Sequence, residues 1–80
     1  MSQIGNAEVR AAARVFVEAR ERMFRYEDCG AMRARDRQEL LVNLALHRLQ
    51  TLLADEVLVL AAIAVAEARY EEKFGEGSLY

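Results

Sequence analysis

The sequence lacks several residues that usually shape a fold. Its 80 residues include no proline, no tryptophan, one cysteine, one histidine and four glycines. Without proline, nothing in the composition forbids long helices. One cysteine cannot form an internal disulfide framework, so a reducing, cytoplasmic environment is expected. The first six residues have neither a basic region nor an apolar segment, so no signal peptide is expected.

Long apolar runs and a strong positive charge are also missing. The longest apolar run has ten residues, Val57 to Ala66, whereas a membrane-spanning helix needs roughly 20. The net charge is −2, which disfavours a general nucleic-acid coat because such proteins need a broad positive surface. We therefore expect no membrane partner, and we expect nucleic acid to be a weaker candidate partner than another protein.

Helix-forming residues are abundant. Apolar residues make up 54% of the chain, and fourteen alanines and ten leucines favour helix. A length of 80 residues allows one domain. The predicted fold class is therefore all-α, as a helical hairpin or a three-helix bundle. It forms one domain over residues 1–80, with residues 75–80 as a loose C-terminal tail.

The first helix is expected over residues 6–27. Asn6 is a good N-cap, and Glu8 lies in the first turn, where the helix dipole favours a carboxylate. Gly30 can adopt the left-handed conformation that ends a helix. Apolar residues recur at alternating spacings of three and four, which predicts a buried stripe. The stripe consists of Val9, Ala12, Phe16, Ala19, Met23 and Tyr26.

Two further helices are expected over residues 32–54 and 55–74, and these two can equally be one long helix. The second helix can begin at Ala31 or Met32, or later with Asp36 as its cap and Glu39 completing a capping box. A break near Asp55 would make that residue the cap of a third helix. One apolar stripe keeps helical spacing through both segments: Val42, Leu46, Leu49, Leu53, Val57, Leu60 and Ala64.

Helix length and the apolar run both favour a homodimer. A single helix from Asp36 to Lys73 would be about 57 Å long, whereas a compact chain of this size is only about 30 Å across. Residues 57–66 are apolar on every side, and such a helix must be buried all round. We therefore predict an intertwined helical homodimer. The candidate interface residues are Leu53, Val57, Leu60, Ile63 and Ala64.

Few side chains are suited to catalysis or metal binding. Cys29 and His47 are the only pair that could act as nucleophile and base, and Glu27 and Asp28 beside Cys29 oppose a thiolate. An exposed Cys29 could instead cross-link two chains. His47 has no strong metal ligand at the helical-neighbour positions. We therefore expect no enzyme activity, no cofactor and no metal, and we assign no catalytic, cofactor-binding or metal-binding residue.

Arginine is concentrated around the first turn. Residues 20–37 contain six arginines and four acidic residues, a local charge of 6 − 4 = +2 in a chain of charge −2. Arginine in a loop or first helical turn can bind phosphates or carboxylates in bidentate fashion. The alternative is pairing within the chain, which leaves no binding site. The candidate partner-binding residues are Arg20, Arg22, Arg25, Arg33, Arg35 and Arg37.

These features favour a small non-enzymatic protein-binding module. It would be a homodimeric inhibitor or adaptor that modulates another protein, and an origin in a phage or another mobile element would fit such a chain. A second hypothesis is a transcriptional or plasmid-type regulator that binds nucleic acid through the arginine-rich segment 20–37. A third is a structural or assembly subunit. Steep salt-dependent binding to DNA would indicate the second class, and a mass above that of a dimer the third.

Overall fold

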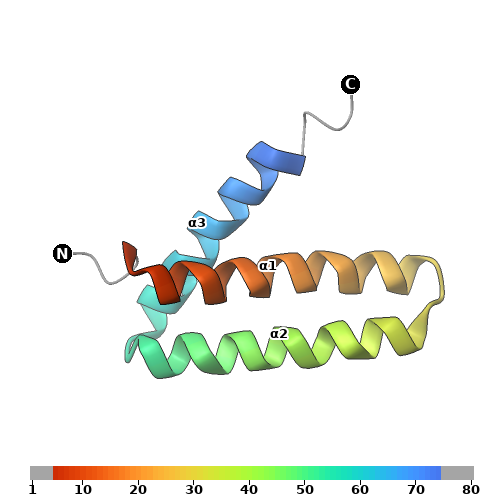
Figure 1. Cartoon of the computed structure of the whole chain (residues 1–80), viewed down its shortest axis with the longest axis horizontal. Coiled ribbons are helices and arrows are strands. Elements are labelled where there is room, and N and C mark those ends of the chain that lie inside the picture. The colour runs from red at the N-terminus through yellow and green to blue at the C-terminus, as the bar shows by residue number, and fades with distance from the viewer. Residues whose placement is uncertain (1–4, 75–80) are drawn as a thin grey trace.

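The computed structural model describes residues 5–74, and these residues form three helices and no strand. Helix α1 spans Ala7–Asp28, α2 spans Met32–Leu52 and α3 spans Glu56–Phe74 (Figure 1). The prediction of an all-α chain is confirmed, and each predicted helix agrees with an observed one to within a few residues. The predicted loose tail, residues 75–80, lies outside the described residues.

Helices α1 and α2 form an antiparallel hairpin (Figure 1). The side chain of Asn6 caps α1, because its Oδ1 accepts a hydrogen bond of 2.8 Å from the backbone N–H of Glu8. At the other end of α1, Gly30 has φ = +78°, a conformation that costs other residues energy. Its N–H donates to the carbonyl of Glu27 at 3.2 Å, so one glycine allows the chain to turn back.

The second helix begins at Met32 and has no side-chain cap at its start. Asp36 therefore lies inside the helix, and the alternative in which it caps α2 with Glu39 is wrong. Gly30 fixes the turn, and the backbone N–H of Arg35 already donates to the carbonyl of Ala31 at 2.9 Å. The turn thus sets the start of α2, and no cap is needed.

The chain breaks between α2 and α3, so residues 36–74 do not form one continuous helix. Leu53 has an extended backbone, with φ = −121° and ψ = 112°. Asp55 then caps α3, because its Oδ1 accepts a hydrogen bond of 2.8 Å from the N–H of Val57. The predicted break with Asp55 as the cap is confirmed. A side-chain acceptor at this point satisfies a helix-end donor that would otherwise have none.

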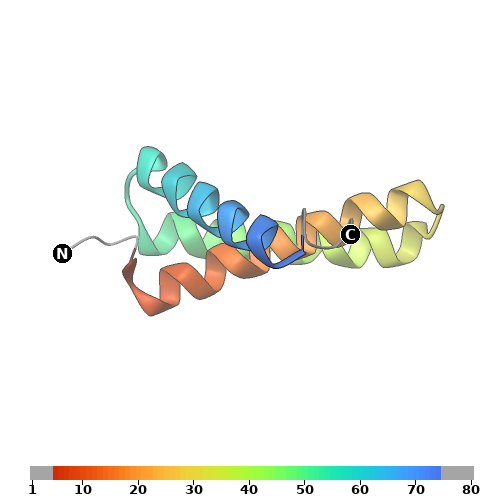
Figure 2. The ribbon, with the colours of Figure 1, turned by 90° about the horizontal axis from the view of Figure 1, so that it is seen from above.

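Helix α1 is the centre of the fold. It packs against both α2 and α3, which make only a few contacts with each other. Helix α3 crosses the hairpin obliquely near its open end and leaves the turn end uncovered (Figures 1 and 2). Leu49, Leu53 and Val17 are the largest fully buried side chains. The rest of the core comprises Val9, Ala12, Ala13, Phe16, Ala45, Val59, Ala62 and Ile63.

The apolar stripe Val42 to Ala64 does not stay on the core side of the fold after the break between α2 and α3. Val42, Leu46, Leu49 and Leu53 pack in or against the core, as their spacing indicates. The residues between α2 and α3 are not helical, so the helical phase is lost there and the stripe does not continue. Helix α3 instead buries Val59, Ala62 and Ile63. The outer face of α3 carries Val57, Leu60 and Ala64, and all three are exposed.

Candidate interaction surfaces

The six arginines of the predicted patch divide into two groups. The first group forms contacts within the chain and consists of Arg20, Arg22 and Arg35. Arg20 forms an ion pair of 3.0 Å with Glu67 of α3, and its guanidinium lies 5.3 Å from the centre of the Phe16 ring. Arg22 donates to Gln38 of α2 at 3.3 Å and lies 3.6 Å from Glu18. These two arginines connect α1 to its neighbours. Their contacts are those of structural side chains.

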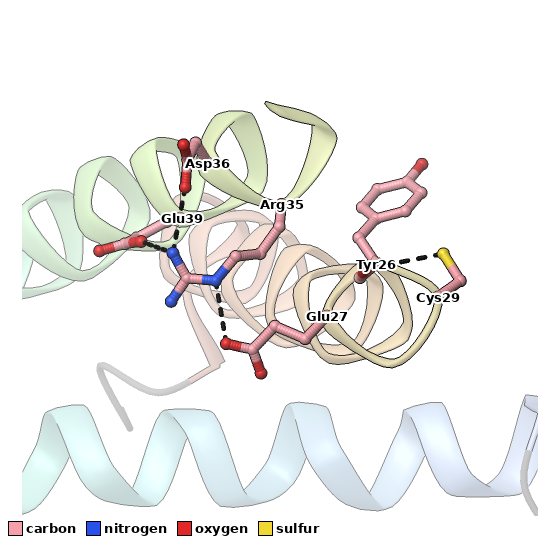
Figure 3. Close-up of polar contacts among 6 residues, drawn as sticks. All are labelled: Tyr26, Glu27, Cys29, Arg35, Asp36 and Glu39. Carbon is pink, nitrogen blue, oxygen red and sulfur yellow. Dashed lines mark hydrogen bonds and ion pairs between the residues drawn. The ribbon is translucent and has the colours of Figure 1, made fainter. Parts of the chain in front are cut away.

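Arg35 is held by three carboxylates at the turn end of the hairpin. Its Nε donates to Glu27 of α1 at 2.9 Å, and its Nη1 donates to Asp36 at 3.1 Å and to Glu39. Figure 3 shows the side chain reaching from α2 to Glu27 on α1. The hydrogen bonds to Glu27 and Asp36, with the nearby charge of Glu39, raise the pKa of Arg35 above its usual range. Arg35 therefore connects the two helices and has little capacity left for a partner.

Arg25, Arg33 and Arg37 form the second group. All three are exposed, and none forms an ion pair with another described residue. Arg33 and Arg37 are four residues apart on α2 and share one face, whereas Arg35 lies on the opposite face. The alternation of these arginines in the sequence therefore does not bring three guanidinium groups together. Only Arg33 and Arg37 of these three lie on the same surface.

Cys29 and His47 lie apart from each other, on the hairpin turn and on α2. Cys29 is exposed, and its thiol donates to the carbonyl of Tyr26 at 3.6 Å, as Figure 3 shows. His47 is exposed on the polar face of α2, where its backbone carbonyl accepts a hydrogen bond of 3.0 Å from Thr51. Within residues 5–74, no cluster of three or more His, Cys, Asp or Glu side chains is arranged to hold a metal ion.

The candidate interface residues also divide into two groups. Leu53 and Ile63 are buried in the core of the single chain, so they add no surface in this arrangement. Val57 is 70% exposed and Leu60 is 61% exposed, and Ala64 is exposed beside them. No charged or polar side chain occurs from residue 57 to residue 66. The outer face of α3, defined here as Val57, Leu60 and Ala64, is thus apolar and open to solvent.

A shallow groove of about 350 Å³ runs between α1 and α2. Leu41 and Leu44 of α2 and Val15 of α1 line it, and all three are exposed. Glu8 and Arg48 close one end of the groove, with a distance of 3.4 Å between their charged groups. This groove has apolar walls, but the charges at its end neutralise each other.

A larger cleft of about 590 Å³ lies between α1 and α3, and sequence reasoning did not find it. Its apolar floor includes Ala13, Val17 and Ala62, and cationic side chains lie along both helices. The spacing of these cations was a signal: they form two pairs four residues apart, one pair on each helix. The pairs are separated by more than fifty residues in the sequence. The four residues are Arg10 and Arg14 of α1, and Arg69 and Lys73 of α3.

None of the three described helices combines the length and the apolar character needed to cross a bilayer. No protein-family model, no curated protein and no solved structure matches the chain.

Proposed function

We propose that this chain is a non-enzymatic protein-binding module that works as a homodimer through the outer face of α3. The observation that carries the proposal is the exposure of Val57 and Leu60 on a helix that has no polar side chain for ten residues. Isolated apolar residues are common on protein surfaces, but a contiguous apolar face on a small protein is typical of an interaction site.

The outer face of α3 suits a second copy of the same chain. In a two-fold dimer each patch meets its own copy, so a patch with a net charge would meet the same net charge. The face formed by Val57, Leu60 and Ala64 has no charge, so this repulsion is absent. Ala64 is small and would let two α3 helices approach closely. Two α3 helices that run antiparallel across the interface would also have a favourable interaction between their dipoles.

The arginine-rich segment supports this function better than it supports nucleic-acid binding. Arg20, Arg22 and Arg35 are engaged within the chain, which leaves only three of the six arginines for a ligand. A regulator that bound nucleic acid through this segment would need more unpaired cations within it to offset the net charge of −2. A modulator of another protein needs only a patch of defined shape and charge.

Light scattering on a concentration series tests the dimer, with a matched pair of variants. Leu60→Glu places a charge in the outer face of α3. We expect it to raise the dissociation constant of the dimer at least about 100-fold, which is a loss of about 2.7 kcal/mol of binding free energy. Leu40→Glu is the control, because Leu40 on α2 is 60% exposed and Leu60 is 61% exposed. We expect Leu40→Glu to leave the mass at two chains.

Three results would contradict the proposal. A wild-type mass of one chain at every concentration would exclude the dimer. An equal loss of dimer mass in Leu60→Glu and Leu40→Glu would show that a new charge disrupts the dimer equally on α2 and on α3. A wild-type mass well above two chains would instead indicate the structural or assembly subunit.

A further inference from the structure

We propose that the cleft between α1 and α3 binds an acidic amphipathic helix of a partner protein. The inference rests on the proposed function, because it names the partner segment of a protein-binding module. It uses a surface different from the outer face of α3, so a dimer joined through α3 would carry two such clefts.

The shape of the cleft suits a helix. Its floor consists mainly of small side chains, among them Ala13 on α1 and Ala62 and Ala66 on α3. Because alanine side chains are short, they leave an open cleft between the two helices, with a volume of about 590 Å³. Amphipathic helices bind in grooves of this kind by laying their apolar face on the groove floor. Val65 is 40% exposed and lines the cleft, so it can contact such a face.

The charges along the cleft determine what the partner must carry. Arg10 and Arg14 lie one helical turn apart on α1, and Arg69 and Lys73 lie one turn apart on α3. All four are exposed, and none forms an ion pair with another described residue. Thus each wall of the cleft presents two unpaired cations to a ligand that lies between the walls.

The acidic residues of the cleft are too few to neutralise these cations. Glu18 and Glu72 are the two acidic lining residues, so the lining charge is 4 − 2 = +2, whereas the whole chain has a charge of −2. Glu18 also lies 3.6 Å from Arg22 and is partly engaged there. A partner helix with carboxylates on both sides of its apolar stripe would meet a cation on each wall.

A peptide fits this arrangement better than a nucleic acid or a small anion. Phosphates would meet the cations but would leave the apolar floor uncovered, which removes the hydrophobic contribution to binding. A single small anion would likewise leave the apolar floor uncovered. An amphipathic helix is the ligand that uses the floor and both walls together.

The test uses two fluorescent helical peptides that differ only in charge. Both have leucines at i, i+3, i+4 and i+7, and one is flanked by glutamates and the other by lysines. We expect the glutamate peptide to bind the full chain at least 10-fold more tightly than the lysine peptide in fluorescence anisotropy. Substitution of all four cleft cations by glutamine should reduce its affinity at least 10-fold. The control, Arg25→Gln with Arg33→Gln and Arg37→Gln, removes three exposed cations outside the cleft and should change the affinity less than 2-fold.

A second variant distinguishes binding of the peptide in the cleft from non-specific electrostatic attraction to the protein. Val65→Ser removes an apolar contact without changing any charge, and we expect it to weaken the glutamate peptide about 3-fold or more. Circular dichroism and light scattering on every variant would check that the helices and the dimer are intact. If Val65→Ser had no effect, and the four-cation variant and the Arg25, Arg33 and Arg37 variant had equal effects, binding would be delocalised and the inference would be wrong.

Other outcomes would assign the cleft to something else. Absence of peptide binding at up to millimolar concentration with an intact dimer would overturn the inference and leave the dimer proposal standing. A loss of dimer mass in the four-cation variant would show that a second copy occupies the cleft. Binding of a short DNA duplex that depends on the same four cations, with no peptide binding, would identify a nucleic-acid site. A monomeric wild-type chain that still binds the peptide would reject the dimer and keep the cleft assignment.

Discussion

Helices α1 and α3 differ in a way that hydrophobicity alone does not predict. Helix α1 has charged residues along its whole length, yet it buries six side chains within the single chain. Helix α3 has an uncharged stretch of ten residues, yet among its described side chains it buries only Val59, Ala62 and Ile63, and it exposes Val57 and Leu60. The more apolar helix is therefore the less buried one.

Position in the fold explains the difference. Helix α1 lies between α2 and α3, so two of its sides are covered (Figure 1). Helix α3 packs mainly on α1, so one side is covered and the other faces solvent. The burial of a helix is thus set by how many neighbours it has. An apolar side without a neighbour marks the surface on which another molecule would be most favourably placed.

The largest effect is expected from a pair of leucine substitutions. Leu49 is 0% exposed, so Leu49→Ala should cost about 2–5 kcal/mol of unfolding free energy through lost burial and a cavity. Leu60→Ala on α3 should cost less than about 0.5 kcal/mol when the chain is dilute enough to be monomeric. Urea denaturation followed by circular dichroism measures both. For a chain of this length the total stability is about 4–12 kcal/mol, so the first loss is large.

Protein concentration makes the same pair of variants more informative. A dimer that buries Leu60 gains stability by mass action, so the cost of Leu60→Ala should increase with protein concentration. The cost of Leu49→Ala should stay constant, because that residue belongs to the core of each chain. A concentration-independent cost for Leu60→Ala, or a cost equal to that of Leu49→Ala, would contradict the contrast between the buried core and the exposed outer face of α3.

A smaller effect is expected from the two helix caps, which have the same geometry. Asn6 and Asp55 each accept a hydrogen bond of 2.8 Å from a backbone N–H two residues later. Asn6→Ala and Asp55→Ala should each cost about 0.5–2 kcal/mol. Hydrogen exchange should distinguish them. Asp55→Ala should speed exchange mainly in α3, because α3 can detach while the hairpin stays folded. A uniform increase across all three helices would show that α3 unfolds only together with the hairpin.

Much of the fold could be predicted because its signals are local. Asn6, Gly30 and Asp55 mark helix ends through their own backbone and side-chain chemistry, and the structure uses all three. The phase of α3 could not be predicted, because a few non-helical residues after Leu52 rotate every later side chain relative to the core. An apolar run such as 57–66 has no polar face that would reveal this rotation.

The surfaces were harder to predict than the helices. The arginine-rich segment was visible in the sequence. Which of its arginines are paired within the chain was not, because Arg35 has carboxylate partners on both helices of the hairpin. The cleft between α1 and α3 depends on the angle at which these helices cross, and no local pattern encodes that angle. Its two pairs of cations could be recognised as neighbours only once the helices were placed.

The smallest effect is expected from the ion pair that connects α1 to α3. Arg20 and Glu67 lie 3.0 Å apart, and Glu67 is 45% exposed, so solvent weakens their attraction. Arg20→Gln also removes the contact with the Phe16 ring, so only a double-mutant cycle with Glu67→Gln isolates the pair. We expect a coupling of about 0.2–1 kcal/mol that decreases in 1 M salt. A coupling above about 2 kcal/mol, or one insensitive to salt, would mean that charge holds α3 on α1. The expected small coupling would leave Val59, Ala62 and Ile63 as the main attachment of α3, on the side opposite its exposed face.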